Sequence, residues 1–149
     1  MAQLIPSVFT KVNKQGDYNW MIQQPKYGNT LFLYNENAIE FLTNSKRVGA
    51  GNAIIRPYRY KSPYPQAACL ITGHSTRHGG YKNLSDYDAK KNIDLAIRDI
   101  EMLIENHEYD RIIYSSDGQD NLGTGIFIVS DDVKKYIMTE LKKIINKKN

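Results

Sequence analysis

The chain has 149 residues, 41% hydrophobic and 24% charged, which is typical of one globular domain and excludes a disordered or fibrous protein. Cys69 is the only cysteine, so no internal disulfide can form, and no signal-peptide pattern or apolar run of roughly 20 residues occurs; we expect a cytoplasmic protein without a membrane partner. Six lysines and one glutamate give residues 134–149 a charge of +5, so the rest of the chain, at −1, is nearly neutral; this distribution of the net charge of +4 favours a solvated helix end over a nucleic-acid surface.

The first half of the chain is predicted to hold short strands separated by loops. Residues 7–24 are expected to form a hairpin with Gly16 in its turn, because glycine accepts positive φ, so that residues 1–29 make a hairpin extension at the edge of the domain. The other elements expected here are a strand at 30–34 that ends at 35–37, helical turns at 38–42, a strand at 53–55 and a strand at 67–71.

The second half alternates helices with a strand. A helix is predicted to begin at Ser85, with Asp88 at the spacing of a capping box. A strand at 111–114 follows, and Ser130 or Asp131 is expected to cap a last helix. The apolar stripes that define the two helices are Ile93, Ala96, Ile97, Ile100, Leu103 and Ile104 in the first, and Val133, Ile137, Leu141 and Ile144 in the second. This order predicts an α/β fold, a mixed and mostly parallel sheet flanked by helices.

Four loops leave the carboxyl ends of the predicted strands. They comprise residues 35–37, 56–65, 72–81 and 115–125. In open α/β sheets ligands bind beyond the carboxyl ends of the strands, so the convergence of these loops predicts where a ligand would lie.

Residues 117–125 form the most suggestive loop because they follow the strand at 111–114 directly. Glycines let a backbone approach a phosphate, successive N–H groups can bind an anion, and Thr124 adds a hydroxyl. Asp117 and Asp120 are better suited to ribose hydroxyls or an adenine amine than to phosphate. The alternative is a tight surface connection that needs positive φ.

Two further segments carry candidate ligand contacts. Arg56 follows the glycine-bearing residues 49–52, and its planar guanidinium suits a phosphate; the alternative is a turn and a surface arginine. Residues 72–81 contain two histidines four apart, but their three glycines argue against the helix that a zinc site would need, so we expect no metal there. This loop is instead predicted to be a lid or rim, with Arg77 and Tyr81 as phosphate and base contacts.

Residues 56–65 interleave basic and aromatic side chains, a combination that can stack on bases and neutralise phosphates. The alternative, which we favour here, is a proline-stiffened surface loop whose tyrosines pack on the domain. The sequence has no Gly-x-Ser-x-Gly motif, and Cys69 lies in an apolar run where we expect it to be buried and inert.

Several short segments, in this order, resemble macro-like domains, especially small ones of bacteriophages and their hosts. They are residues 31–37 (LFLYNEN), 51–56 (GNAIIR), 71–73 (ITG), 112–118 (IIYSSDG) and 122–125 (LGTG). The resemblance covers roughly residues 30–145. This chain lacks the early Asn-Asn-Gly-rich stretch of ordinary macro domains, and residues 119–121 lengthen the loop before Gly123.

The resemblance implies an ADP-ribose-like nucleotide held between two glycine-rich loops. Gly123, Thr124 and Gly125 would form the diphosphate loop, with Asn35, Asn37 and Asn52 as polar contacts at the strand ends. Together with the loop residues above, the expected ligand contacts are Asn35, Asn37, Gly51, Asn52, Arg56, Gly73, Arg77, Asp117, Gly118, Gly123, Thr124 and Gly125.

The leading hypothesis is therefore a protein that sequesters a signalling nucleotide or hydrolyses an ADP-ribose derivative, with a role in phage counter-defence by family analogy. If it is an enzyme, it is a hydrolase, with no catalytic residue assigned. No cofactor or metal is expected, and self-association stays open. The alternative is a nucleic-acid- or partner-binding protein without enzymatic activity.

Overall fold

The chain folds into a mixed five-stranded sheet in which four strands are parallel, as shown by a computed structural model that describes residues 2–125 and 127–148. The strand order is β1-β5-β2-β3-β4, and β4 alone runs antiparallel to its neighbour. The strands are β1 (Gln3–Ser7), β2 (Thr30–Asn37), β3 (Ala67–Ser75), β4 (Gly79–Gly80) and β5 (Arg111–Ser115). The predicted α/β class with a mostly parallel sheet is confirmed.

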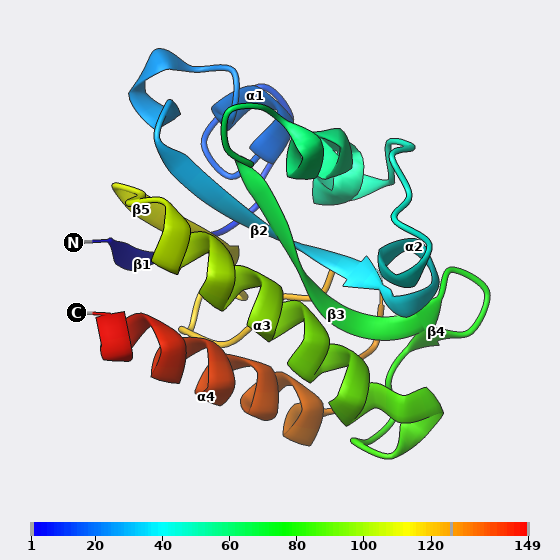
Figure 1. Ribbon diagram of the computed structural model, residues 1–149. Helices are drawn as coiled ribbons and strands as arrows, with labels where there is room; N and C mark the ends of the chain where they lie inside the picture. The colour runs from blue at the N-terminus through cyan, green and yellow to red at the C-terminus, as the bar shows by residue number, and fades with distance from the viewer. Residues whose placement is uncertain (1, 126, 149) are drawn as a thin grey trace.

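Helices cover both faces of this sheet. The two long helices, α3 and α4, lie side by side on one face, whereas α1 and η2 lie on the other (Figure 1). The carboxyl ends of β2 and β3 point away from the two chain termini in this view. The helical elements are α1 (Tyr18–Met21), η1 (Pro25–Tyr27), α2 (Ala38–Leu42), η2 (Gly51–Tyr60), η3 (Asp86–Asp88), α3 (Ala89–Asn106) and α4 (Asp131–Lys148).

The core forms where the predicted apolar stripes of the long helices meet the sheet. In α3 the residues Ile93, Ala96, Ile97, Ile100 and Ile104 are buried, as expected from their helical spacing. All four stripe residues of α4 are buried as well. The strands β2 and β3 are buried on both faces over most of their length, as central parallel strands are.

The predicted N-terminal hairpin is wrong. Residues 18–21 form α1, and the Asp17 carboxylate caps it by accepting the Asn19 N–H at 3.1 Å. β1 instead pairs in parallel with β5, from the other half of the chain. Gly16 does turn the chain, with φ +104°, and a side chain there would come within 2.0 Å of the Val8 carbonyl oxygen. The turn signal was therefore real, but it leads into a helix.

Other boundaries also differ from the prediction. β2 continues through residues 35–37, which were expected to form a loop. The expected strand at 53–55 is part of the 3₁₀-helix η2, because its short apolar run packs beside β2 and β3 instead of joining them. The loop predicted from residue 72 begins later, since β3 continues to Ser75 and β4 returns beside it. α3 begins at Ala89, and Asp88 precedes it in a left-handed conformation without capping through its side chain, so the capping box at Ser85 is wrong.

Candidate functional site

The carboxyl ends of β2 and β5 bring together three of the predicted site residues. Asn35 Nδ2 donates to the Gly123 carbonyl oxygen at 2.7 Å, which ties the end of β2 to the loop after β5. Asn52, at the start of η2, donates from Nδ2 to Ser115 Oγ at 3.4 Å. The ends of β2 and β5 and the start of η2 thus meet at this edge of the sheet, which we call the carboxyl edge. Residues 35–37 belong to β2 and residues 56–60 to η2, so these two segments are not the loops that the sequence predicted.

The loop at residues 116–122 is held by its own side chains. The Asp117 carboxylate accepts the N–H groups of Gln119 at 2.7 Å and Asn121 at 3.3 Å. These bonds, that from Gln119 first, hold the pKa of Asp117 below its usual range. Gly118 is exposed, and its N–H donates to Ser116 Oγ at 3.0 Å. Asp117 therefore shapes the loop instead of offering a free carboxylate.

Gly123 and Thr124 are committed to the loop's own structure. The Gly123 N–H donates to the Ser115 carbonyl oxygen at 2.9 Å, and a side chain at Gly123 would approach the Ser116 backbone to 2.7 Å. The Thr124 hydroxyl donates to the Phe127 carbonyl oxygen at 2.9 Å. The requirement for glycine at position 123 is thus explained by packing against the chain at Ser116.

Gly125 differs from Gly123 because it is exposed and faces open space. Its φ is +60°, and no atom lies within 4 Å of a side chain placed there. Among the described residues, the N–H groups of Thr124 and Gly125 have no hydrogen-bond acceptor. Two successive backbone donors beside a left-handed glycine are able to receive an anion.

Asn35 adds an unused acceptor to this edge. While its Nδ2 is bound to Gly123, its Oδ1 is buried and has no hydrogen-bond partner among the described residues. A buried acceptor left unpaired is costly, so a group that donates a hydrogen bond to Asn35 Oδ1 would stabilise the site.

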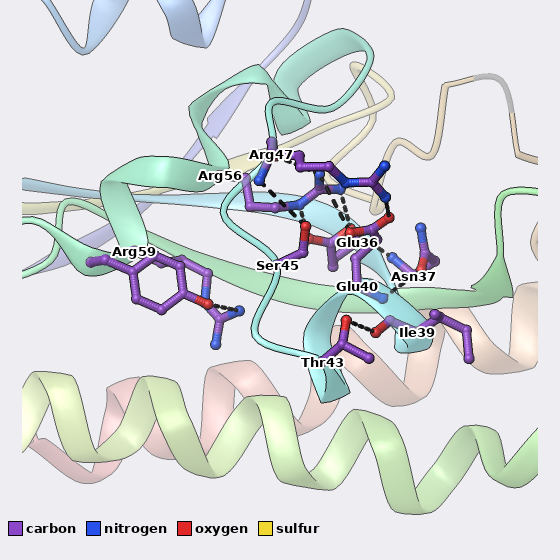
Figure 2. A network of polar contacts seen from close by, with 10 residues as sticks. Glu36, Asn37, Ile39, Glu40, Thr43, Ser45, Arg47, Arg56 and Arg59 are labelled. Carbon is purple, nitrogen blue, oxygen red and sulfur yellow. Dashed lines mark hydrogen bonds and ion pairs between the residues drawn. The ribbon is translucent and has the colours of Figure 1, made fainter.

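Arg56 was expected to contact a phosphate, but its side chain lies inside the protein. Its Nε and Nη2 donate to the two Glu36 carboxylate oxygens at 2.6 and 2.7 Å, and its side chain is only 6% exposed. Figure 2 shows this pair, with Arg56 Nη1 donating to the Arg47 carbonyl oxygen and Glu40 binding Arg47. The hydrogen bonds that Arg56 donates to Glu36 raise the pKa of the Arg56 guanidinium further. Its charge is therefore neutralised by a carboxylate within the fold.

The polar residues Asn37 and Asn52 have internal partners as well. Asn37 Oδ1 accepts the Glu40 N–H at 2.9 Å and so caps α2. Asn52 Oδ1 accepts the Tyr18 N–H at 3.1 Å, which fastens α1 to η2. Gly51, directly before Asn52, is exposed. These residues lie at strand or helix ends, as the sequence predicted, but the sequence did not indicate that the fold itself uses their side chains.

The remaining predicted residues lie at the turn between β3 and β4. Gly73 is buried because β4 passes close to it, and a side chain there would meet the Gly79 carbonyl oxygen at 2.3 Å. Arg77 is exposed, and no hydrogen bond or ion pair among the described residues joins it to the carboxyl edge loops. Tyr81, expected at a rim, is fully buried and bound by Asn92, so that expectation is wrong.

An aromatic cluster at this turn was not anticipated. The rings of His74 and Tyr87 stack at 4.1 Å, and His78 lies 5.1 Å from Tyr87 and 5.3 Å from His74. Two histidines four apart at a strand end were the signal in the sequence, but Tyr87 is brought to them only by the fold. Within residues 2–125 and 127–148, no three His, Cys, Asp or Glu side chains are grouped so that they could hold a metal ion.

None of the described helices has the length and apolar character needed to cross a membrane. Comparisons with models of known families, with curated proteins and with solved structures give no match to this chain.

Proposed function

We propose that the chain is a macro-like domain that binds an ADP-ribose-like nucleotide at the carboxyl edge. The observation that carries the proposal is the pair of N–H groups at Thr124 and Gly125, which have no acceptor within residues 2–125 and 127–148 and follow Gly123, to which Asn35 donates. Loops at the carboxyl ends of parallel strands are where α/β sheets bind such ligands.

The chemistry of the edge fits a ligand with both phosphates and hydroxyls. The Thr124 and Gly125 N–H groups would donate to a diphosphate, and Gly125 leaves room for it. Asn35 Oδ1 would accept a hydrogen bond from a ribose hydroxyl. Gly51, Gly118 and Arg77, which are exposed, would contact the rest of the nucleotide. Arg56, Asn37 and Asp117 would then act by shaping the surrounding loops.

The test compares Gly125→Val with Gly79→Val by calorimetric titration with ADP-ribose. Both glycines have positive φ and open space at the side-chain position, so the two substitutions impose similar strain. Gly125→Val should abolish binding, because the new side chain occupies the place of the phosphate, whereas Gly79→Val should bind as the parent does. In the parent, ADP-ribose at 100 times its Kd should add about 2.7 kcal/mol to the free energy of unfolding.

A folded Gly125→Val protein that binds ADP-ribose like the parent would contradict the proposal. Sequestration and hydrolysis are separated by incubating the protein with an ADP-ribose derivative and analysing the mixture by chromatography. Unchanged ligand that stays bound would support sequestration, and new products would support a hydrolase. The role in phage counter-defence remains a proposal by family analogy, and it requires that the ligand be a host signalling nucleotide.

A further inference from the structure

A group of cations and aromatic rings lies at the carboxyl-terminal end of η2, whose first two residues, Gly51 and Asn52, belong to the carboxyl edge. Residues 58–61 at the end of this helix meet two side chains from an earlier part of the chain, Phe41 of α2 and Lys46 of the following loop. We call this group the cation–aromatic surface; it consists of Phe41, Lys46, Tyr58, Arg59, Tyr60 and Lys61.

Each cation of this surface lies over an aromatic ring. The Arg59 guanidinium is 5.0 Å from the centre of the Phe41 ring and 5.4 Å from that of Tyr60. The Lys46 ammonium lies 5.0 Å from the Tyr60 ring centre. Lys61 lies 5.9 Å from the ring of Tyr58. Figure 2 shows Arg59 next to an aromatic ring, apart from the Glu36–Arg56 pair.

The positive charge of this surface is largely uncompensated. Among the described residues, neither Lys46 nor Lys61 has a carboxylate partner, and Lys61 is bound only by the Gln66 amide. Arg59 reaches Asp99 at 3.5 Å, and the Asp99 carboxylate is itself 55% exposed. The nearby Glu40 is already engaged by Arg47. Arg59 is itself only 10% exposed, so the charges that this surface offers to an anionic partner are those of Lys46 and Lys61.

We infer that the cation–aromatic surface binds single-stranded nucleic acid. Tyr60, Lys46 and Lys61 are exposed, so one aromatic ring and two positive charges are accessible to a ligand. An unstacked base would replace the Lys46 ammonium on the Tyr60 ring, because base stacking is stronger than an exposed cation–π contact, and the ammonium would turn to a phosphate. The bases of a duplex are already stacked on one another, and the carboxylates of an acidic peptide do not stack on a ring. A single strand is therefore the ligand that uses both the Tyr60 ring and the lysines.

The experiment measures binding of a short, fluorescently labelled oligodeoxythymidine by anisotropy over a range of salt concentrations. Tyr60→Leu should weaken binding about five-fold or more, because it removes the stacking ring. Lys46→Ala should lower the slope of log K against log salt by about 0.7, the contribution of one phosphate contact on a single strand. Thermal unfolding of each variant checks that the fold is retained.

Two control variants carry matched changes elsewhere. Tyr87→Leu removes another exposed tyrosine, and Lys142→Ala removes an exposed lysine of the basic C-terminal helix; both should bind the oligonucleotide as the parent does. The inference is overturned if the parent does not bind at low salt, or if a control loses as much affinity as its counterpart. Loss of binding to phosphatidylserine vesicles in Tyr60→Leu, with oligonucleotide binding retained, would assign the surface to membranes instead.

The inference does not depend on the proposed nucleotide site, and one measurement separates the two. Excess ADP-ribose should leave oligonucleotide binding unchanged, since Gly125 and Tyr60 belong to different segments. Competition between the two ligands would overturn the inference of a separate surface, whereas the titrations of Gly125→Val test the nucleotide site alone.

Discussion

Arg56 and Glu36 form a two-bond ion pair inside the protein that fastens η2 to the end of β2. Both side chains are nearly excluded from water, at 6% and 1% exposure. Glu40, whose Oε2 lies 3.9 Å from Arg56 Nη1, pairs with Arg47, and the Arg47 side chain is 80% exposed. The two pairs therefore have different environments, and the cost of breaking each should differ accordingly.

Arg56→Ala should lower the free energy of unfolding by about 3–5 kcal/mol, because it leaves the Glu36 carboxylate buried without a cation, with the Asn37 N–H as its remaining partner. Arg47→Ala, on the exposed pair, should cost about 0–1 kcal/mol. Urea unfolding followed by circular dichroism measures both. Equal losses in the two variants would mean that burial does not set the strength of these pairs.

The Cys69 thiol is buried in β3, and burial raises its pKa well above the usual range. Since the thiolate is the reactive form, native protein at neutral pH should not react with Ellman's reagent, and the thiol should become reactive only on unfolding. Absorbance on adding the reagent, with and without urea, is the measurement. Full labelling of native protein would contradict this, as would loss of ADP-ribose binding in a folded Cys69→Ala protein.

The conformation of the loop at residues 116–122 should depend on pH, because the Asp117 carboxylate holds it. Because the hydrogen bonds from Gln119 and Asn121 lower its folded pKa, the stabilisation they give is present above the ordinary value of about 3.9 and is lost as pH falls through the lowered pKa. The Gln119 amide signal in NMR spectra should therefore shift only below pH ~3.9. Asp117→Asn should remove this transition, and a midpoint above the ordinary value would show that the carboxylate is not held by these bonds.

At the scale of elements, α4 depends on its apolar stripe more than on its lysines. Ile137 is fully buried, whereas Lys143 is exposed and pairs with Glu140 on the helix surface. Ile137→Ala should lower the free energy of unfolding by about 2–5 kcal/mol, because it leaves a cavity, and Lys143→Ala should change it by no more than about 0.5 kcal/mol. Chemical denaturation of both variants compares them directly. Similar losses would mean that the basic face also holds the helix.

Elements with a strong apolar pattern were predictable from the sequence. β2, β5 and the stripes of α3 and α4 lie where their residues indicate, because burial against the sheet requires that spacing. The strand expected at 53–55 failed since a three-residue apolar run does not distinguish a strand from a buried helical turn. The pairing of β1 with β5 is a contact between distant segments, and no local pattern of residues 3–24 encodes it.

The candidate site was predictable in position but not in detail. The parallel strand order brings Asn35, Asn52 and Gly123 to one edge, as expected. The role of Arg56 was not predictable, because its partner Glu36 lies twenty residues earlier within a buried strand. The one signal in the sequence was the position of Glu36 in an apolar strand, because a buried carboxylate is rarely found without a cation as its partner. The nucleotide itself stays a prediction.

At the scale of the whole molecule, the sheet is completed by its first strand. β1 pairs with β5 from Gln3–Arg111 to Ser7–Ser115, and α4 packs against it. The covered strand β5 has buried residues at Ile112, Ile113 and Tyr114. Without β1, the hydrogen-bonding edge of this apolar strand would be open to solvent.

A variant that lacks residues 2–7 should therefore associate and melt without a single cooperative transition, because an open apolar edge strand pairs with other chains. Size-exclusion chromatography and thermal unfolding are the measurements. Gln3→Ala, at an exposed position of β1, should remain like the parent. A shortened protein that elutes and melts like the parent would show that β5 does not need its neighbour.

The same pairing sets an order of events during synthesis. β1 leaves the ribosome first, but its partner β5 is made on the order of 100 residues later. At about 5–20 residues per second, the first strand waits roughly 5–20 s before the sheet can close. During that time β2 and β3, which are neighbours both in the chain and in the sheet, are able to pair. β5 must then enter between β1 and β2, so the nascent chain has to leave that position unpaired until β5 has been made.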